Sequence, residues 1–79
     1  MSIAYTILRK SGMGHSLSET LVDLIREGRV YSAWELFQVK YPSKVDRLIL
    51  INKARSIYST VKHRDETSIL VEKCLDYLT

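Results

Sequence analysis

The chain has 79 residues, of which 46% are hydrophobic and 27% charged, and its formal net charge is +3. This length allows one domain, so we expect residues 1–79 to fold as a single helical unit, and the hydrophobic fraction excludes wholesale disorder. The single cysteine, Cys74, excludes an internal disulfide, and without Cys/His clusters we expect no structural metal. No apolar run approaches the roughly 20 residues that cross a bilayer, and no secretory pattern opens the chain. We therefore expect an intracellular protein, nuclear or cytoplasmic, with no membrane partner.

The charge is unevenly distributed along the chain. Residues 1–40 carry a net charge of +1, residues 41–64 a net charge of +5 and residues 65–79 a net charge of −3. A basic middle followed by an acidic end indicates either complementary packing within the chain or an anionic partner for the middle segment.

The first fifteen residues predict a short element and a loop. The apolar residues of segment 1–10 fit a helix of two turns, and a strand fits them as well. Segment 11–15 contains Gly12 and Gly14 and is expected to be a loop. A glycine loop before a helix can cradle a phosphate, but the third glycine and the lysine of such motifs are missing here. We therefore expect a plain turn and no cofactor.

Segment 16–28 is the most clearly helical stretch of the chain. Its apolar residues recur at the spacing of one helix face: Leu17, Leu21, Leu24 and Ile25. Ser16 and Glu19 have the spacing of a capping box, which would begin the helix. Gly28 supplies a residue that can turn left-handed and end it.

Segment 29–40 predicts a third helix. Ser32 and Glu35 have the spacing of a second capping box. Pro42 disfavours a helical conformation of the residue before it, so the helix should end near Lys40.

The fourth helix is expected from about Lys44 to Lys62, opened by the Pro-Ser pair before it. Its first half is apolar nearly all round, which predicts burial on several sides, by this chain or by another. The residues concerned are Val45, Leu48, Ile49, Leu50 and Ile51. A strand also fits residues 56–61, a polar turn follows at 63–66, and a last helix is expected over 67–78. The choice between helix and strand for residues 56–79 stays open at this point.

Together these segments predict an all-α fold, a small bundle of four to five short helices. A domain this small buries little more than about 60% of its surface. Because neither a disulfide nor a metal adds stability here, we expect oligomerisation to complete the bundle.

Enzymatic function is not expected. Cys74 falls on an apolar helical stripe, where a small core residue is more common than a nucleophile. His15 and His63 lie in polar turns, and no Ser/His/Asp set or carboxylate pair has a catalytic arrangement. The chain is also too short for a sizeable pocket, so we expect no small-molecule substrate.

A protein-binding surface is the first candidate site. The helical stripe of segment 16–28 and the large aromatic groups that follow it offer more apolar surface than a small domain buries alone. The residues predicted to bind a partner are Leu17, Leu21, Leu24, Ile25, Trp34, Phe37 and Tyr41. The partner is expected to be another protein or a second copy of the chain.

A row of basic residues is the second candidate site. At 100° per residue, Lys44, Arg55 and Lys62 project within roughly 20° of one another on a helix, with Arg47 about 60° to the side. The row would span about 27 Å, long enough to follow several phosphates of a nucleic acid backbone. Such a row binds without reading sequence, and a solvated helix face is its simpler interpretation.

From Tyr5 to Val30 the sequence resembles the small (gamma) subunit of the eukaryotic general transcription factor IIA. The matching residues are Tyr5, Arg9, Ser11, Gly14, Ser16, Leu17, Leu21, Leu24, Ile25, Gly28, Arg29 and Val30. The resemblance implies a helical hairpin that joins a hairpin of a larger subunit in a four-helix bundle. It also implies that the apolar residues of segment 17–25 pack against partner helices. Pro42 falls where that family continues its helix, and too few residues follow for the family's β-barrel, so contacts with the TATA-binding protein are not carried over.

A second, shorter stretch is similar to the pre-coat protein of geminiviruses, which suppresses RNA silencing. The residues concerned are Gly14, His15, Leu17, Leu21, Ile25, Arg26 and Ala33. This similarity implies a small helical homodimer that lays a basic row on RNA, whose duplex form is recognised mainly by shape and phosphates. The expected function is therefore a non-enzymatic helical binding module resembling a subunit-association region of a transcription factor, with an RNA-binding homodimer as the alternative.

Overall fold

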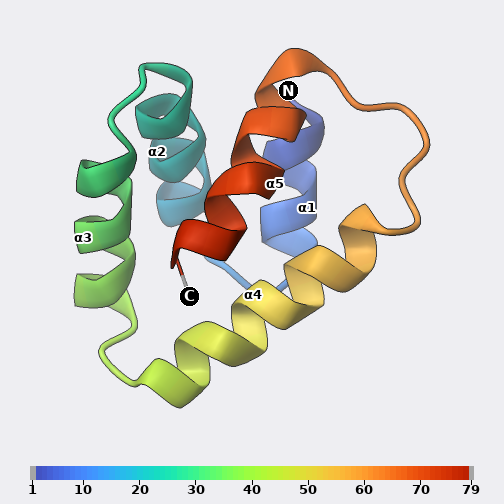
Figure 1. Ribbon diagram of the computed structural model, residues 1–79. Coiled ribbons are helices and arrows are strands. Elements are labelled where there is room, and N and C mark those ends of the chain that lie inside the picture. The colour runs from blue at the N-terminus through green and yellow to red at the C-terminus, as the bar shows by residue number, and fades with distance from the viewer. Residues whose placement is uncertain (1, 79) are drawn as a thin grey trace.

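A computed structural model describes residues 2–78 and confirms the all-α prediction (Figure 1). Over these residues the chain forms five helices and no strand. They are α1 (Ile3–Lys10), α2 (His15–Arg26), α3 (Val30–Lys40), α4 (Lys44–Tyr58) and α5 (Glu66–Leu78). The alternative of a strand in the last third of the chain is thereby excluded for the described residues.

Helix α5 lies in the middle of the bundle (Figure 1). It packs against α1, α2 and α4, whereas α3 packs mainly against α2 at one side of the molecule. Helix α4 runs along another edge, and no other helix lies beyond it. The two outermost helices are therefore α3 and α4, each with one face toward the bundle and one face away from it.

Two glycines end the first two helices. Gly28 has a φ of 81°, and the amide groups of Gly28 and Arg29 donate to the carbonyl oxygens of Ile25 and Leu24 at 3.0 and 2.8 Å. This pair of hydrogen bonds is a Schellman motif, which confirms the predicted end of α2. Gly12, with a φ of 112°, ends α1 in the same way.

The predicted starts of α2 and α3 are wrong. Helix α2 begins at His15 after an extended Gly14, so Ser16 lies inside the first turn and caps nothing. Helix α3 begins at Val30, which places Ser32 inside it as well. Neither helix start has a side-chain cap, because each helix begins as soon as the preceding glycine turn ends, before the chain reaches the serine.

The break at Pro42 is confirmed, but α4 is shorter than predicted. It begins at Lys44 and ends at Tyr58, four residues before Lys62. The hydroxyl groups of Ser59 and Thr60 donate to the carbonyl oxygens of Ser56 and Ile57 at 2.6 and 2.8 Å. These bonds compete with the continuing helix and mark its last turn.

One cluster of buried side chains draws on all five helices. Tyr58 and Phe37 are its largest fully buried members. Within this chain α4 is buried on one side only, through Ile51, Ala54 and Tyr58, so its predicted burial on several sides is met by the chain itself on that side alone. Within residues 2–78 no other element covers the opposite face of α4, so burial of that face would require another chain.

Candidate protein-binding surface

The structure places most of the predicted partner-binding residues inside the chain's own core. Leu17, Leu21, Ile25 and Phe37 are buried, and Leu24, Trp34 and Tyr41 are half-buried against the same cluster. The apolar face of α2 is therefore covered by α1, α3 and α5. The buried members of the set cannot contact another molecule while this core is intact.

The outer face of α3 carries large apolar side chains in solvent. Ala33 and Phe37 point into the core, so residues 31, 35 and 39 lie on the opposite side of the helix. Tyr31 is 63% exposed and Val39 is 73% exposed. The ring of the half-buried Trp34 lies 6.2 Å from that of Tyr31, centroid to centroid, and widens this apolar area.

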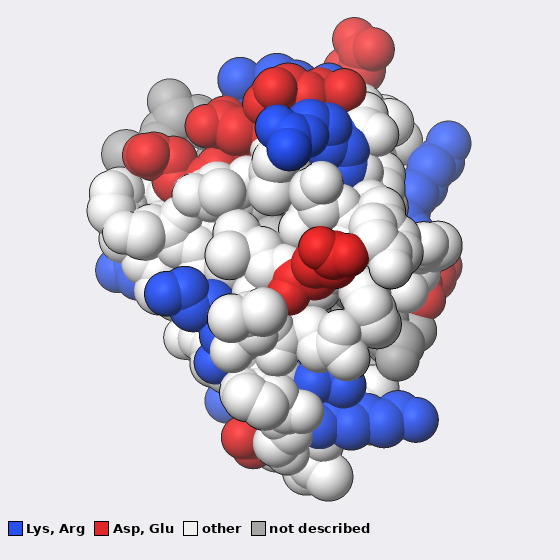
Figure 2. Space-filling model, turned by 90° about the vertical axis from the view of Figure 1, so that its left-hand side faces the viewer, with Lys and Arg blue, Asp and Glu red and all other residues white. Residues whose placement is uncertain are grey.

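Figure 2 views the molecule from the α3 side. Uncharged atoms cover most of the middle of this side, with one acidic side chain among them, and the other charged groups gather toward its margins. Few charged residues at the centre and a polar rim are usual for a protein–protein interface.

The outer face of α4 is the second exposed apolar area. Val45 and Ile49 lie one turn apart on this face and are 65% and 47% exposed. Beside them, Tyr41, Asp46, Ile49 and Leu50 line a shallow hollow of about 220 Å³. We call Tyr31, Val39, Val45 and Ile49 the exposed apolar residues of α3 and α4.

The predicted basic row does not form. Lys62 lies beyond the end of α4, so it does not continue the helical line of Lys44 and Arg55. Arg47 donates to the carbonyl oxygens of Tyr41 and Pro42 at 2.7 and 2.8 Å, which ties down the turn between α3 and α4. Arg55 forms an ion pair with Asp76 of α5. Two of the four basic groups therefore have partners within the fold: Arg47 holds the turn before α4, and Arg55 pairs with the acidic end of the chain.

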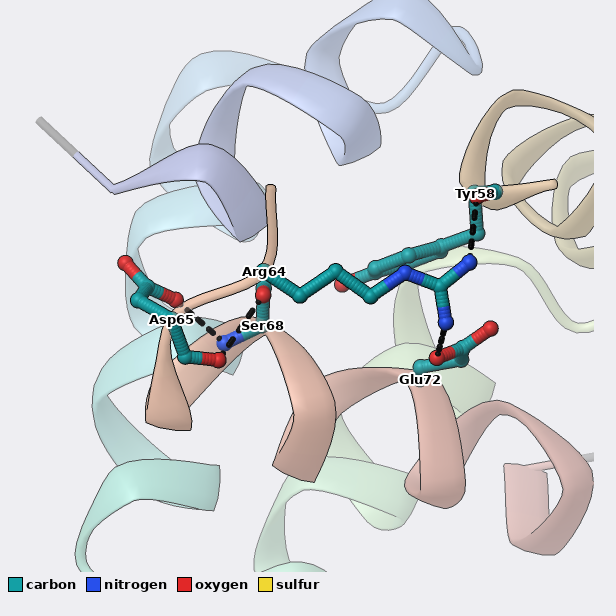
Figure 3. Close-up of polar contacts among 5 residues, drawn as sticks. All are labelled: Tyr58, Arg64, Asp65, Ser68 and Glu72. Carbon is teal, nitrogen blue, oxygen red and sulfur yellow. Dashed lines mark hydrogen bonds and ion pairs between the residues drawn. The ribbon is translucent and has the colours of Figure 1, made fainter. Parts of the chain in front are cut away.

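A polar cluster closes the segment between α4 and α5, where a polar turn was expected (Figure 3). Arg64 donates to the Tyr58 carbonyl oxygen at 2.6 Å, forms an ion pair with Glu72, and lies over the Tyr58 ring at 5.8 Å from its centroid. The Asp65 carboxylate accepts a hydrogen bond of 2.7 Å from the Ser68 amide and caps α5. The signal available in the sequence was the Asp-x-x-Ser spacing of this cap, whereas the contacts of Arg64 depend on the tertiary fold.

His15 lies at the start of α2 and Cys74 on α5. His15 hydrogen-bonds the Tyr5 hydroxyl group through Nδ1 and lies 3.8 Å from the Glu19 carboxylate. These side chains line an open hollow of about 200 Å³ between α1 and α2. Burial raises the pKa of the Cys74 thiol, which keeps it in its less nucleophilic protonated form. Over residues 2–78, no three His, Cys, Asp or Glu side chains are placed to hold a metal ion.

Comparisons with protein-family models, with curated proteins and with solved structures gave no match. Within the described part of the chain, no helix combines the length and the apolar character needed to cross a membrane.

Proposed function

We propose that this chain is a non-enzymatic helical module that functions by binding another polypeptide through the outer faces of α3 and α4. The observation that carries the proposal is the exposure of Tyr31, Val39 and Val45, each more than 60% accessible to solvent. Burying apolar surface contributes about 25 cal/mol per Å², and aromatic side chains are frequent anchors of interfaces. A partner that covers these side chains would gain this free energy.

The resemblance to the transcription factor IIA small subunit supports association with other helices as the class of function. That resemblance implies partner contacts through Leu17, Leu21 and Ile25, which this chain uses for its own core. The proposed contacts therefore move from α2 to α3 and α4. A role as a subunit of a transcription-factor-like complex is the specific form of the proposal that the resemblance favours.

RNA binding is not part of the proposal. Arg47 and Arg55, two of the four residues expected to follow a nucleic acid backbone, donate their hydrogen bonds to groups of this chain. Lys44 and Lys62 are exposed, but they do not share one helix.

Photo-crosslinking inside cells that make the protein naturally tests the proposal. A photoreactive residue replaces Tyr31 on α3 or Val45 on α4, and in two control variants it replaces Thr6 or Thr20, which are exposed on α1 and α2. We expect discrete heavier adducts from the first pair and none from the controls. Adducts that form equally at all four positions, or at none, would overturn the proposal. Circular dichroism of each purified variant verifies that the fold is kept.

A further inference from the structure

We infer that the outer face of α4 binds the same face of a second copy of this chain, with the two α4 helices antiparallel and a twofold axis near Ile49. This inference rests on the proposed function and names the partner of one of its two faces.

The outer face of α4 has the spacing of a helix–helix contact. Val45, Ile49, Asn52 and Ser56 follow one another at intervals of four, three and four residues and are all exposed. Side chains at these intervals form one stripe along a helix, the spacing that pairs of packed helices use. Helix α4 runs along the edge of the bundle (Figure 1), and because the stripe is exposed a second helix can approach it.

Two opposite charges flank the apolar centre of this stripe. Asp46 comes three residues before Ile49 and Lys53 four residues after it, which corresponds to about 4.5 and 6 Å along the helix axis. Asp46 and Lys53 are seven residues apart, so they lie on the same side of the stripe. Both are exposed, and within residues 2–78 neither the Asp46 carboxylate nor the Lys53 ammonium group has an ion pair.

The order of these charges selects the antiparallel arrangement. A twofold axis perpendicular to two antiparallel helices keeps the same side of each stripe together, so Asp46 of one copy faces Lys53 of the other, and the reverse. Two ion pairs then lie on one side of the contact between the two Ile49 side chains, one toward each end of it. In a parallel pair, Asp46 and Lys53 of the two copies lie on opposite sides of the contact and do not meet.

The outer face of α3 lacks this self-complementarity. Its charged residue, Glu35, lies midway between Tyr31 and Val39. A twofold pairing centred on this face would bring two Glu35 carboxylates together, and like charges at an interface are strongly unfavourable. The second copy is therefore assigned to α4, which leaves α3 for another polypeptide.

Sedimentation velocity of the full chain over about a hundredfold range of concentration tests the inference. We expect a reversible dimer. Asp46→Lys or Lys53→Asp should each raise the dimer dissociation constant about tenfold or more, because each creates two like-charge contacts. The double variant Asp46→Lys/Lys53→Asp restores both ion pairs in reverse order and should recover most of the loss. Glu35→Lys on α3 is the matched control and should leave the dissociation constant unchanged.

A chain that stays monomeric at every concentration would overturn the inference. So would a dimer whose dissociation constant does not change when the charges of Asp46 and Lys53 are reversed. Failure to fold is separated from failure to pair by the double variant, which keeps the charge composition of the parent chain. The crosslinking experiment separates this inference from the proposed function. Adducts at Val45 with twice the mass of the chain support both. Adducts with other polypeptides alone sustain the proposed function and overturn the second copy as partner, and the absence of any adduct overturns both.

Discussion

Tyr58 both stabilises and destabilises the fold. Its ring is fully buried at the end of α4, and its hydroxyl group has no hydrogen-bond partner among the described residues. A buried, unpaired hydroxyl costs about 1–3 kcal/mol relative to one that is solvated. The ring nonetheless stays in place because it fills the core and lies under the Arg64 guanidinium group.

Replacement of Tyr58 by Phe should therefore leave stability unchanged or raise it by about 1 kcal/mol, since the ring is kept and the unpaired hydroxyl is removed. Urea unfolding followed by circular dichroism measures the change. Tyr58→Leu, which removes the ring, is the control and should cost stability through lost packing. A clear loss in the Phe variant would show that the hydroxyl group has a partner after all.

The same hydroxyl group makes the free energy of unfolding depend on pH under alkaline conditions. Burial raises the pKa of Tyr58, and Glu72 adds to the effect. The unfolded chain has a tyrosine pKa of about 10, so the folded state holds this proton more tightly than the unfolded state does. Stability is therefore fully present below about pH 10 and falls as the pH rises above it. We expect Tyr58→Phe to lose less stability than the parent chain between about pH 10 and 11; an identical fall in both would contradict this.

At the scale of the helices, the ends were predictable wherever a single residue determines them. Gly28 tolerates the left-handed conformation that ends a helix, and Pro42 disfavours a helical residue before it, so the ends of α2 and α3 were predicted correctly. The serine caps were wrong because their spacing is met by chance inside a helix that has already begun. The end of α4 depends partly on Arg64, six residues further along and held by Glu72 of another helix, which no local pattern reveals.

Gly28→Ala tests the end of α2. The alanine side chain would meet no neighbouring atom, so its whole effect comes from the φ of 81°. An L-residue in this left-handed region costs about 1–2 kcal/mol, and asparagine tolerates it better. We expect Gly28→Ala to lower the free energy of unfolding by about 1 kcal/mol and Gly28→Asn to lower it by less. Equal losses would indicate that something other than the backbone conformation determines the effect.

Arg64→Ala tests the closure between α4 and α5. The change removes the donor to the Tyr58 carbonyl oxygen and leaves the Glu72 carboxylate without its cation. Hydrogen bonds that involve a charged group contribute about 1.5–3 kcal/mol, and partial exposure of this site reduces the figure, so we expect a loss of about 1–2 kcal/mol. Lys62→Ala, in the same segment and exposed, is the matched control and should change stability by less than about 0.5 kcal/mol. Chemical denaturation of both variants measures the two changes in the free energy of unfolding.

For the whole molecule, the sequence pattern identified which helix faces are apolar but not which element covers each face. The stripe of α2 and the ring of Phe37 were expected to face a partner, and they face the chain itself. Val45 and Ile49 were expected to be buried by this chain or by another, and this chain leaves them facing solvent. Amphipathicity shows only that a face prefers burial. The covering element is determined by how α1, α2 and α5 pack together, which depends on contacts between residues far apart in the sequence.

The division between core and surface gives opposite expectations for two residues of α3. Phe37 is fully buried and Val39 is 73% exposed, two positions further along the same helix. Phe37→Ala should cost about 3–5 kcal/mol, much of the stability available to so small a domain, whereas Val39→Ala should change it by less than about 0.5 kcal/mol. Val39→Ala should still weaken binding if the outer face of α3 contacts a partner, because affinity and stability then depend on different sides of one helix. A Val39→Ala chain that unfolds as readily as Phe37→Ala would mean that α3 is covered on both sides within the isolated protein.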